Sequence, residues 1–213
     1  MIKAELESIL GTDSVLCRRP LSQYTSFKVG GPAEYLVLPG DYSQVAQIIA
    51  FCAENSIQWH VLGRGTNLLV SDNGLPGVVI VLGDNLAAVR VAGARIVAQA
   101  GASLPRVSAI ALVNSLAGLE FANGIPGSVG GAVTMNAGAY GGEMKDVLLR
   151  VLTVNSRGEL SAFGPKEMEL GYRSSVFQRN GHVVLEAELE LVPGDAGAIR
   201  SEERRVGKEC RSR

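Results

Sequence analysis

The residues of this chain best suited to chemistry are small ones, gathered in two glycine-rich segments. The longer segment, residues 118–142, holds eight of the chain's 26 glycines and no Lys or Arg. Glycine is needed where backbone takes positive φ or comes close to another group, and successive backbone N–H groups can hold an anion. Apolar residues are interleaved throughout, whereas flexible linkers are polar. We therefore predict that this segment presses its backbone against a large, flat ligand that carries phosphates.

The second segment, residues 61–70, reads VLGRGTNLLV and has an apolar run on each side of its glycines. This pattern predicts strand, tight turn and strand, with the turn amides and the Thr66 and Asn67 side chains free to hold an anion. No Gly-Lys-Ser/Thr follows, so it is not a Walker A loop. It also fits a dinucleotide fingerprint poorly, because Leu68 replaces the third glycine and no long helical pattern follows. A plain β-hairpin is the alternative interpretation.

Hydrophobic periodicity predicts the elements that position these segments. The clearest helix has Val45, Ile48, Ile49 and Cys52 at helical spacing after Asp41, a suitable N-cap. The order of elements predicts an α+β protein with a small β-α-β lobe and a larger mixed lobe. Helices are expected at 3–10, 41–55 and 104–115, and strands at 33–38, 59–62, 68–70, 78–82, 88–92, 95–100, 148–155, 159–163 and 182–191.

Composition excludes several functional classes. The hydrophobic content of 46% and charged content of 19% suit a sizeable core. Apolar runs are too short for a membrane span, so no membrane insertion is expected. A net charge of −1 leaves no electrostatic footprint for nucleic acid.

The N-terminus lacks the basic and long apolar regions of a signal peptide, which predicts a cytoplasmic protein. Cys17, Cys52 and Cys210 are widely spaced and predict free thiols. His60 and His182 have no Cys or carboxylate at ligand spacing, so no metal site is expected.

Residues 200–213 differ from the rest in carrying six Lys or Arg, three acids and one aliphatic residue, Val206. One interpretation is a disordered basic tail that cannot contribute to a core. The other is that the segment is not native, because it resembles the translation of a common sequencing-library adaptor that begins Arg-Ser-Glu-Glu. We adopt the second interpretation, and expect a native helix to begin over residues 195–199.

Taken together, the motifs resemble those of the UDP-N-acetylenolpyruvoylglucosamine reductase family, also called UDP-N-acetylmuramate dehydrogenases. The resemblance covers roughly residues 20–192 and keeps its motifs in order. They are TSFKVGGPA at 25–33, LGRGTNLLV at 62–70, GLEF at 118–121, IPGSVGGA at 125–132, MNAGAYG at 135–141 and GYRSSVF at 171–177.

The resemblance implies a two-lobed FAD-binding fold of the vanillyl-alcohol-oxidase/PCMH type, with FAD between the lobes. Residues 1–67 are expected to form the first FAD-binding subdomain and residues 68–192 the second. Residues 193–199 would begin a third, substrate-binding lobe, truncated here, and residues 200–213 would be the non-native tail. A monomer is expected.

The resemblance also implies which residues bind the cofactor and which act in catalysis. Arg173 and Tyr172 would be the catalytic residues, with Arg173 facing the enolpyruvyl group at the flavin. Ile125 and Pro126 would form a rigid wall against the flavin, or an ordinary proline turn. Arg64 would contact a phosphate or remain a solvated surface residue. The cofactor-binding set is Gly63, Arg64, Gly65, Thr66, Asn67, Leu68, Ile125, Pro126, Gly127, Ser128, Gly130, Gly131, Ala132, Asn136, Gly138 and Ala139.

The implied reaction is reduction of UDP-N-acetylglucosamine enolpyruvate, a nucleotide sugar, to UDP-N-acetylmuramate. NADPH would be the hydride donor, and the product would serve peptidoglycan synthesis, hence cell shape and division. The family takes its proton donor, a Ser, from the third lobe, with help from a late Glu, and neither is assigned here. The alternatives are a catalytically inactive FAD-binding fragment and, less consistent with the glycine pattern, a nicotinamide-binding Rossmann domain.

Overall fold

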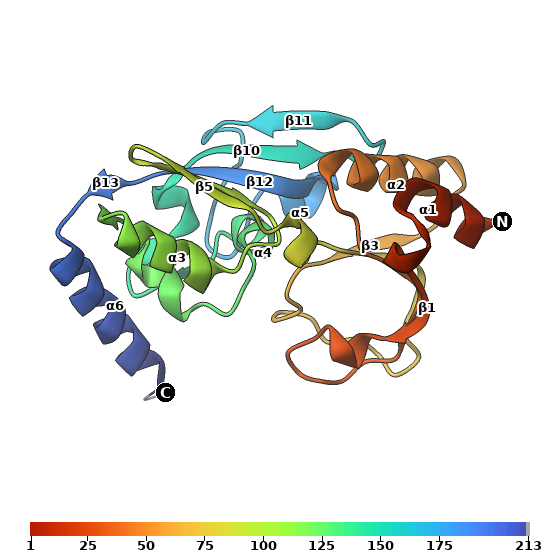
Figure 1. The fold of residues 1–213 in the computed structure, drawn as a ribbon, viewed down its shortest axis with the longest axis horizontal. Helices are drawn as coiled ribbons and strands as arrows, with labels where there is room; N and C mark the ends of the chain where they lie inside the picture. Colours follow the sequence, from red (N-terminus) through yellow and green to blue (C-terminus); the bar gives the residue numbers. More distant parts are fainter. Residues whose placement is uncertain (212–213) are drawn as a thin grey trace.

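The chain folds around a four-stranded and a five-stranded β-sheet (Figure 1). One hydrophobic cluster contains residues of both sheets. This computed structural model describes the backbone of residues 1–211 and the side chains of residues 1–206. The first sheet has the order β1-β2-β4-β3. Its strands are β1 (Val15–Pro20), β2 (Pro32–Val37), β3 (Trp59–Leu62) and β4 (Leu75–Val81), with α1 (Ile2–Leu10) and α2 (Tyr42–Glu54) packed beside them.

The strand–turn–strand prediction at the first glycine segment, and with it the hairpin alternative, is wrong. Strand β3 pairs with β4 in parallel, so residues 63–74 form a long connection between two parallel strands. The strand expected at 68–70 is absent, because these residues lie in the connection. Leu69 there is 74% exposed, and the carbonyl of Ser71 accepts a hydrogen bond from Gly31 N–H. A short apolar run does not by itself distinguish a strand from a loop. Because β4 completes this sheet, the expected boundary at residue 67 falls inside it.

The second sheet is antiparallel throughout, with the order β11-β10-β12-β6-β5. Strand β12 buries Val183, Leu185, Ala187 and Leu189 as expected, but Val184 is buried too, so the alternation holds only from Leu185 onward. The helices α3 and α4 cover one face, and the outer face carries ion pairs such as Arg95–Glu188. The strands are β5 (Val89–Ala92), β6 (Arg95–Gln99), β10 (Leu148–Val154), β11 (Leu160–Phe163) and β12 (Val183–Glu190).

The predicted helices are confirmed as α1, α2 and α3 (Leu104–Val113), whereas α4 (Val129–Thr134) was not expected. Its six residues include two glycines, which weaken a helical pattern. Ser128 begins it by accepting a bond from Gly131 N–H. The remaining short elements are α5 (Phe177–Asn180), β7 (Leu116–Ala117), β8 (Gly138–Ala139), β9 (Gly142–Glu143) and β13 (Val192–Pro193).

The C-terminal segment is helical, in α6 (Ala196–Arg211), so the disordered-tail alternative is wrong for the described residues. Asp195 caps the helix, and Ile199, Glu203 and Val206 share its inner face. Val206 is 1% exposed, and Ser108 Oγ donates to Glu203 Oε1 at 2.7 Å. The helix packs on α3 and on the 3-10 helix η4 (Glu120–Gly124). Its start near residue 196 is confirmed, and the non-native origin of residues 200–213 stays a prediction.

Helix α2 packs against residues of both sheets. Asp41 accepts from Gln44 N–H at 2.8 Å and begins the helix as predicted. Its buried face packs against first-sheet residues and against Val154, Val183 and Leu185 of the second sheet. The helix therefore helps to hold the two sheets together.

Tyr42, the first residue of α2, provides a test of that packing. Its hydroxyl donates to Glu186 Oε2 on β12 at 3.0 Å, and burial raises the pKa of Tyr42 to about 12 from 10.0. Because the folded state favours the protonated phenol, this stabilisation is complete below pH 10 and is lost as pH rises through about 12. We expect the free energy of unfolding to fall more steeply over this range than in Tyr42→Phe, measured by urea denaturation. Parallel pH curves for the two proteins would contradict this role.

Candidate functional site

The two glycine segments meet around a cavity of about 380 Å³, with Arg173 at its wall. Val61, Leu62, Met135 and Ala137 supply further lining. Of the predicted cofactor residues, the cavity is lined by Gly63, Arg64, Gly65, Thr66, Asn67, Leu68, Ile125, Pro126, Gly127, Ser128, Gly131 and Ala132.

The remaining predicted residues lie on two adjoining cavities. Gly130 lines one of about 550 Å³, which shares Gly63, Ser128 and Gly131 with the first. Asn136, Gly138 and Ala139 line another of about 280 Å³, together with Tyr172 and Arg173. Arg173 therefore lines both the first cavity and this third one.

The first glycine turn offers free backbone donors. Within the described residues, no hydrogen bond is recorded for the backbone N–H groups of residues 64–67. Gly65 has φ +62°, and a Cβ atom there would lie 2.2 Å from the carbonyl oxygen of Tyr24. The Gly65 carbonyl accepts a hydrogen bond from Ser26 N–H at 3.0 Å, which holds the turn against residues 24–26. Sequence reasoning did not assign this supporting role to Ser26, although its motif was visible.

The two glycine segments touch at the limit of atomic contact. A Cβ atom at Gly63 would lie 2.4 Å from Ser128 Oγ, and one at Gly130 would lie 2.9 Å from the Cβ of Ala100. Ser128 is 3% exposed and caps α4. A side chain at Gly63 or Gly130 would therefore clash, and both glycines line the 550 Å³ cavity.

Tyr172 and Arg173 form the tip of a tight turn closed by Gly171 and Ser174, whose backbones bond to each other at 3.0 and 3.2 Å. Tyr172 is 93% exposed. Arg173 has φ +52°, an uncommon conformation for a residue other than glycine. Its guanidinium has no ion-pair partner among the described residues, so a cation at the cavity wall remains available to an anionic ligand. Arg64 is likewise without an ion pair in the described part of the chain.

Helix α4 anchors this turn. Ser175 Oγ donates to the carbonyl of Thr134 at 2.6 Å, and Gln178 Nε2 donates to the carbonyl of Arg173 at 3.2 Å. Gln178 also contacts the sulfur of Met135. One end of α4 thus lies at the glycine cavity, and its other end holds the turn that carries Arg173.

Glu143 borders the third cavity and forms an ion pair with Lys145. The hydrogen bond from Lys145, with a smaller one from Asn136, holds the pKa of Glu143 below its usual value. The same contact with Glu143 raises the pKa of Lys145. Glu143 is therefore a stable anion, and it was not among the predicted site residues.

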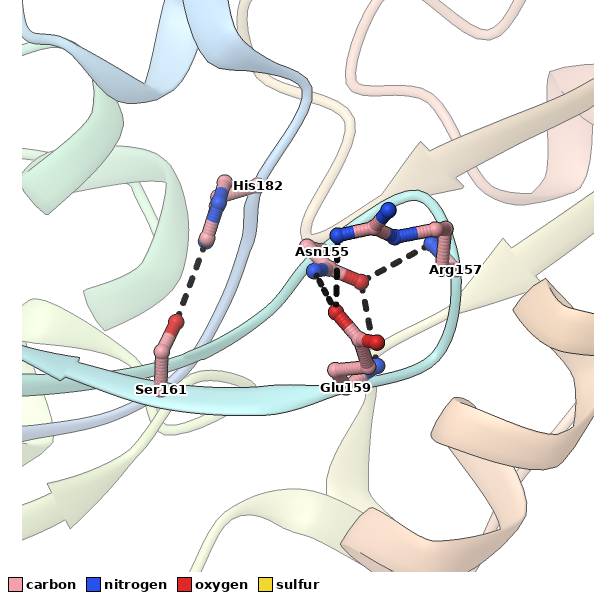
Figure 2. Close-up of polar contacts among 5 residues, drawn as sticks. All are labelled: Asn155, Arg157, Glu159, Ser161 and His182. Carbon is pink, nitrogen blue, oxygen red and sulfur yellow. Dashed lines mark hydrogen bonds and ion pairs between the residues drawn. The ribbon is translucent and has the colours of Figure 1, made fainter.

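Both histidines, which the sequence left isolated, line the 550 Å³ cavity. The Nε2 atom of His60 is buried and has no partner among the described residues. His182 Nδ1 lies 2.9 Å from Thr153 Oγ1, and burial lowers the pKa of His182. Figure 2 shows its second contact, with Ser161 Oγ at 3.4 Å. Among residues whose side chains are described, no three His, Cys, Asp or Glu gather where they could hold a metal ion.

Comparison with known proteins identifies the family. Residues 33–164 match the family model described as an FAD binding domain. UDP-N-acetylenolpyruvylglucosamine reductase from Thermus caldophilus superposes with a TM-score of 0.80 at 32% identity, over 93% of this chain and 69% of that one. The chain belongs to the UDP-N-acetylenolpyruvoylglucosamine reductase family. The reductase of Clostridium novyi is 44% identical over 93% of the chain, and that of Syntrophomonas wolfei is 43% identical over 93%.

The chain spans about 64% of the length of the Clostridium novyi reductase and 66% of the Syntrophomonas wolfei one. A 4-ethylphenol oxidase from Gulosibacter chungangensis has the same fold, with a TM-score of 0.68 at 18% identity over 90% of this chain and 42% of that one. The predicted two-lobed α+β FAD-binding fold of the vanillyl-alcohol-oxidase/PCMH type is thus confirmed.

Other expectations from the sequence have structural counterparts. Cys17 and Cys52 are free thiols as predicted, and the side chain of Cys210 lies outside the described residues. Within the described residues, no helix combines the length and apolar character that crossing a bilayer requires.

The close contact behind Gly65 gives a direct test of the first turn. Gly65→Ala should lower the free energy of unfolding by about 1–3 kcal/mol more than Gly93→Ala, because only the former adds a steric clash. Gly93 is a matched control, with φ +60° and nothing within 4 Å of an added Cβ. Urea denaturation measures both variants, and equal losses would contradict the tight packing of this turn.

Proposed function

We propose that this protein is the FAD-dependent part of a reductase that uses NADPH to convert UDP-N-acetylglucosamine enolpyruvate to UDP-N-acetylmuramate for peptidoglycan synthesis. The observation that carries the proposal is the cavity between the two glycine segments, with the available guanidinium of Arg173 at its wall. Family membership supports the assignment. Since the chain spans about 64% of the length of the Clostridium novyi reductase, the whole reaction stands as a proposal.

The residues of the cavity fit FAD. A pyrophosphate needs backbone donors with little side-chain bulk, and the free amides of residues 64–67 beside Gly127, Ser128 and Gly131 provide them. Arg64 would add a charge-assisted contact to a phosphate. When bound, FAD supplies a redox centre that receives a hydride from NADPH and passes it to the methylene carbon of the substrate.

Arg173 would act on the substrate. Hydride addition places negative charge on the carbon next to the methylene group and on its carboxylate. A guanidinium held there before the reaction stabilises this charge more in the transition state than in the ground state. The left-handed backbone of Arg173 and the anchors from Ser175 and Gln178 hold its side chain at the cavity.

Tyr172 stands beside Arg173 on the third cavity, where its exposed phenol would contact the nucleotide-sugar substrate. Protonation of the substrate carbon needs an acid, and we assign none among the described residues. The alternative function is therefore an FAD-binding module without turnover. We further propose that the protein acts in the cytoplasm, as a monomer, and without a nucleic-acid partner.

A nicotinamide-binding Rossmann domain is disfavoured, because the first glycine turn leads into a loop and β4, with no helix. The visible spectrum of the chain reconstituted with FAD separates these alternatives. We expect a bound-flavin absorption band and quenched flavin fluorescence after removal of free FAD. A colourless protein that binds NADP alone would overturn the FAD assignment.

Substitution of Arg173 tests its role in turnover. In a full-length reductase carrying this segment, Arg173→Lys should retain FAD and lower kcat by about 10²–10³, because lysine lacks the planar fork of donors. Stopped-flow measurement of flavin reoxidation by the enolpyruvyl substrate isolates this step from reduction by NADPH. Unchanged turnover would remove Arg173 from the mechanism.

A further inference from the structure

Asn136 is a buried polar residue whose two side-chain donors are both engaged within the protein. It is 2% exposed and has φ +39°, a conformation that Asn tolerates better than most residues. Its Nδ2 donates to Glu143 Oε2 at 2.6 Å and to the carbonyl of Gly171 at 2.9 Å. Its Oδ1 accepts from the backbone N–H of Lys145 at 2.9 Å. A carboxamide has two N–H donors, so none remains for a ligand.

Two of these bonds are local, to residues 7 and 9 positions away, whereas the bond to Gly171 spans 35 positions. Gly171 opens the turn that carries Tyr172 and Arg173, while Glu143 ends strand β9 and also lines the third cavity, with Lys145 two residues further on. Ser175 and Gln178 also tie the turn to the end of α4. Among these side-chain anchors, Asn136 alone contacts Gly171, the residue that begins the turn.

We infer that Asn136 is a positioning residue, which acts through the Gly171 carbonyl to hold Arg173 at the cavity and does not itself contact FAD. The consequence for substrate rests on the proposed function, since Arg173 is the group that would meet the substrate carboxylate. The hydrogen bond to Gly171 is a property of the chain alone and can be tested without cofactor.

The test substitutes Asn136→Asp, which keeps size and φ tolerance but replaces the two N–H donors by an oxygen. Amide hydrogen exchange of the unliganded chain, read by mass spectrometry, should quicken about tenfold for the peptide covering residues 171–175. Exchange over residues 128–132 should stay unchanged. The FAD dissociation constant, from flavin fluorescence, should stay within about twofold of wild type.

Asn155 provides a matched control, because it makes a similar set of bonds (Figure 2) and lines none of the three cavities. Its Nδ2 donates to Glu159 Oε2 at 2.7 Å, and its Oδ1 accepts from the backbone N–H groups of Arg157 and Glu159. Asn155→Asp makes the same chemical change beside a glutamate. It should leave exchange at 171–175 at the wild-type rate.

A double variant separates the two donor bonds and guards against general misfolding. In Asn136→Asp with Glu143→Gln, donor and acceptor change places, so the bond between positions 136 and 143 is restored while the bond to Gly171 is still absent. Fast exchange at 171–175 should persist in this variant. A return to the wild-type rate would overturn the role of the Gly171 contact.

A second readout asks whether Asn136 acts through Arg173. The FAD-loaded chain is titrated with UDP-N-acetylglucosamine enolpyruvate and followed by the flavin absorption spectrum. As a single substitution, Asn136→Asp should weaken binding of this substrate about tenfold. Added to Arg173→Ala, it should have no further effect. Additive losses, or loss of FAD affinity with an unchanged turn, would overturn the inference. If the wild-type chain binds no FAD, the proposed function fails while the exchange result still decides the positioning role.

Discussion

The contact between Gly63 and Ser128 is the constraint on which the rest of this structure depends. One residue follows the edge strand of the first sheet, and the other caps a helix that covers the second. They approach so closely that an added Cβ atom would lie 2.4 Å from the serine oxygen. A side chain at position 63 would thereby clash with Ser128, and glycine leaves the backbone bare at the cavity. A ligand with phosphates can be held there without a large cluster of positive charge.

Such a contact requires the two sheets to be held at a fixed separation, and α2 provides this. Its buried face packs into both sheets, and Tyr42 bonds to Glu186 on β12. The site therefore lies at a junction whose width is set by a packed core, which resists small displacements. Glycine at the junction costs conformational entropy, and the surrounding aliphatic packing offsets that cost.

The reactive turn is built differently from the glycine cavity. Arg173 stands on an uncommon backbone conformation that its neighbours impose, through the mutual bonds of Gly171 and Ser174 and the anchors to α4. Strain of this kind is retained at sites where the surrounding structure over-determines it. Helix α4 also lines the glycine cavity. One short helix therefore contacts both the proposed cofactor site and the turn that carries Arg173.

Local pattern determined much of this protein: the helical spacing of α2 and its Asp41 cap, the alternation of β12, and the motifs that carry the family resemblance. These follow from neighbouring residues, which set backbone conformation and the exposed faces of each element. The parallel pairing of β3 with β4, the burial of Val206 on α6 and the three bonds of Asn136 were decided only by tertiary structure. The strand pairing, the Val206 burial and the Asn136 bond to Gly171 depend on partners distant in sequence, and short-range periodicity carries no information about which distant groups will meet.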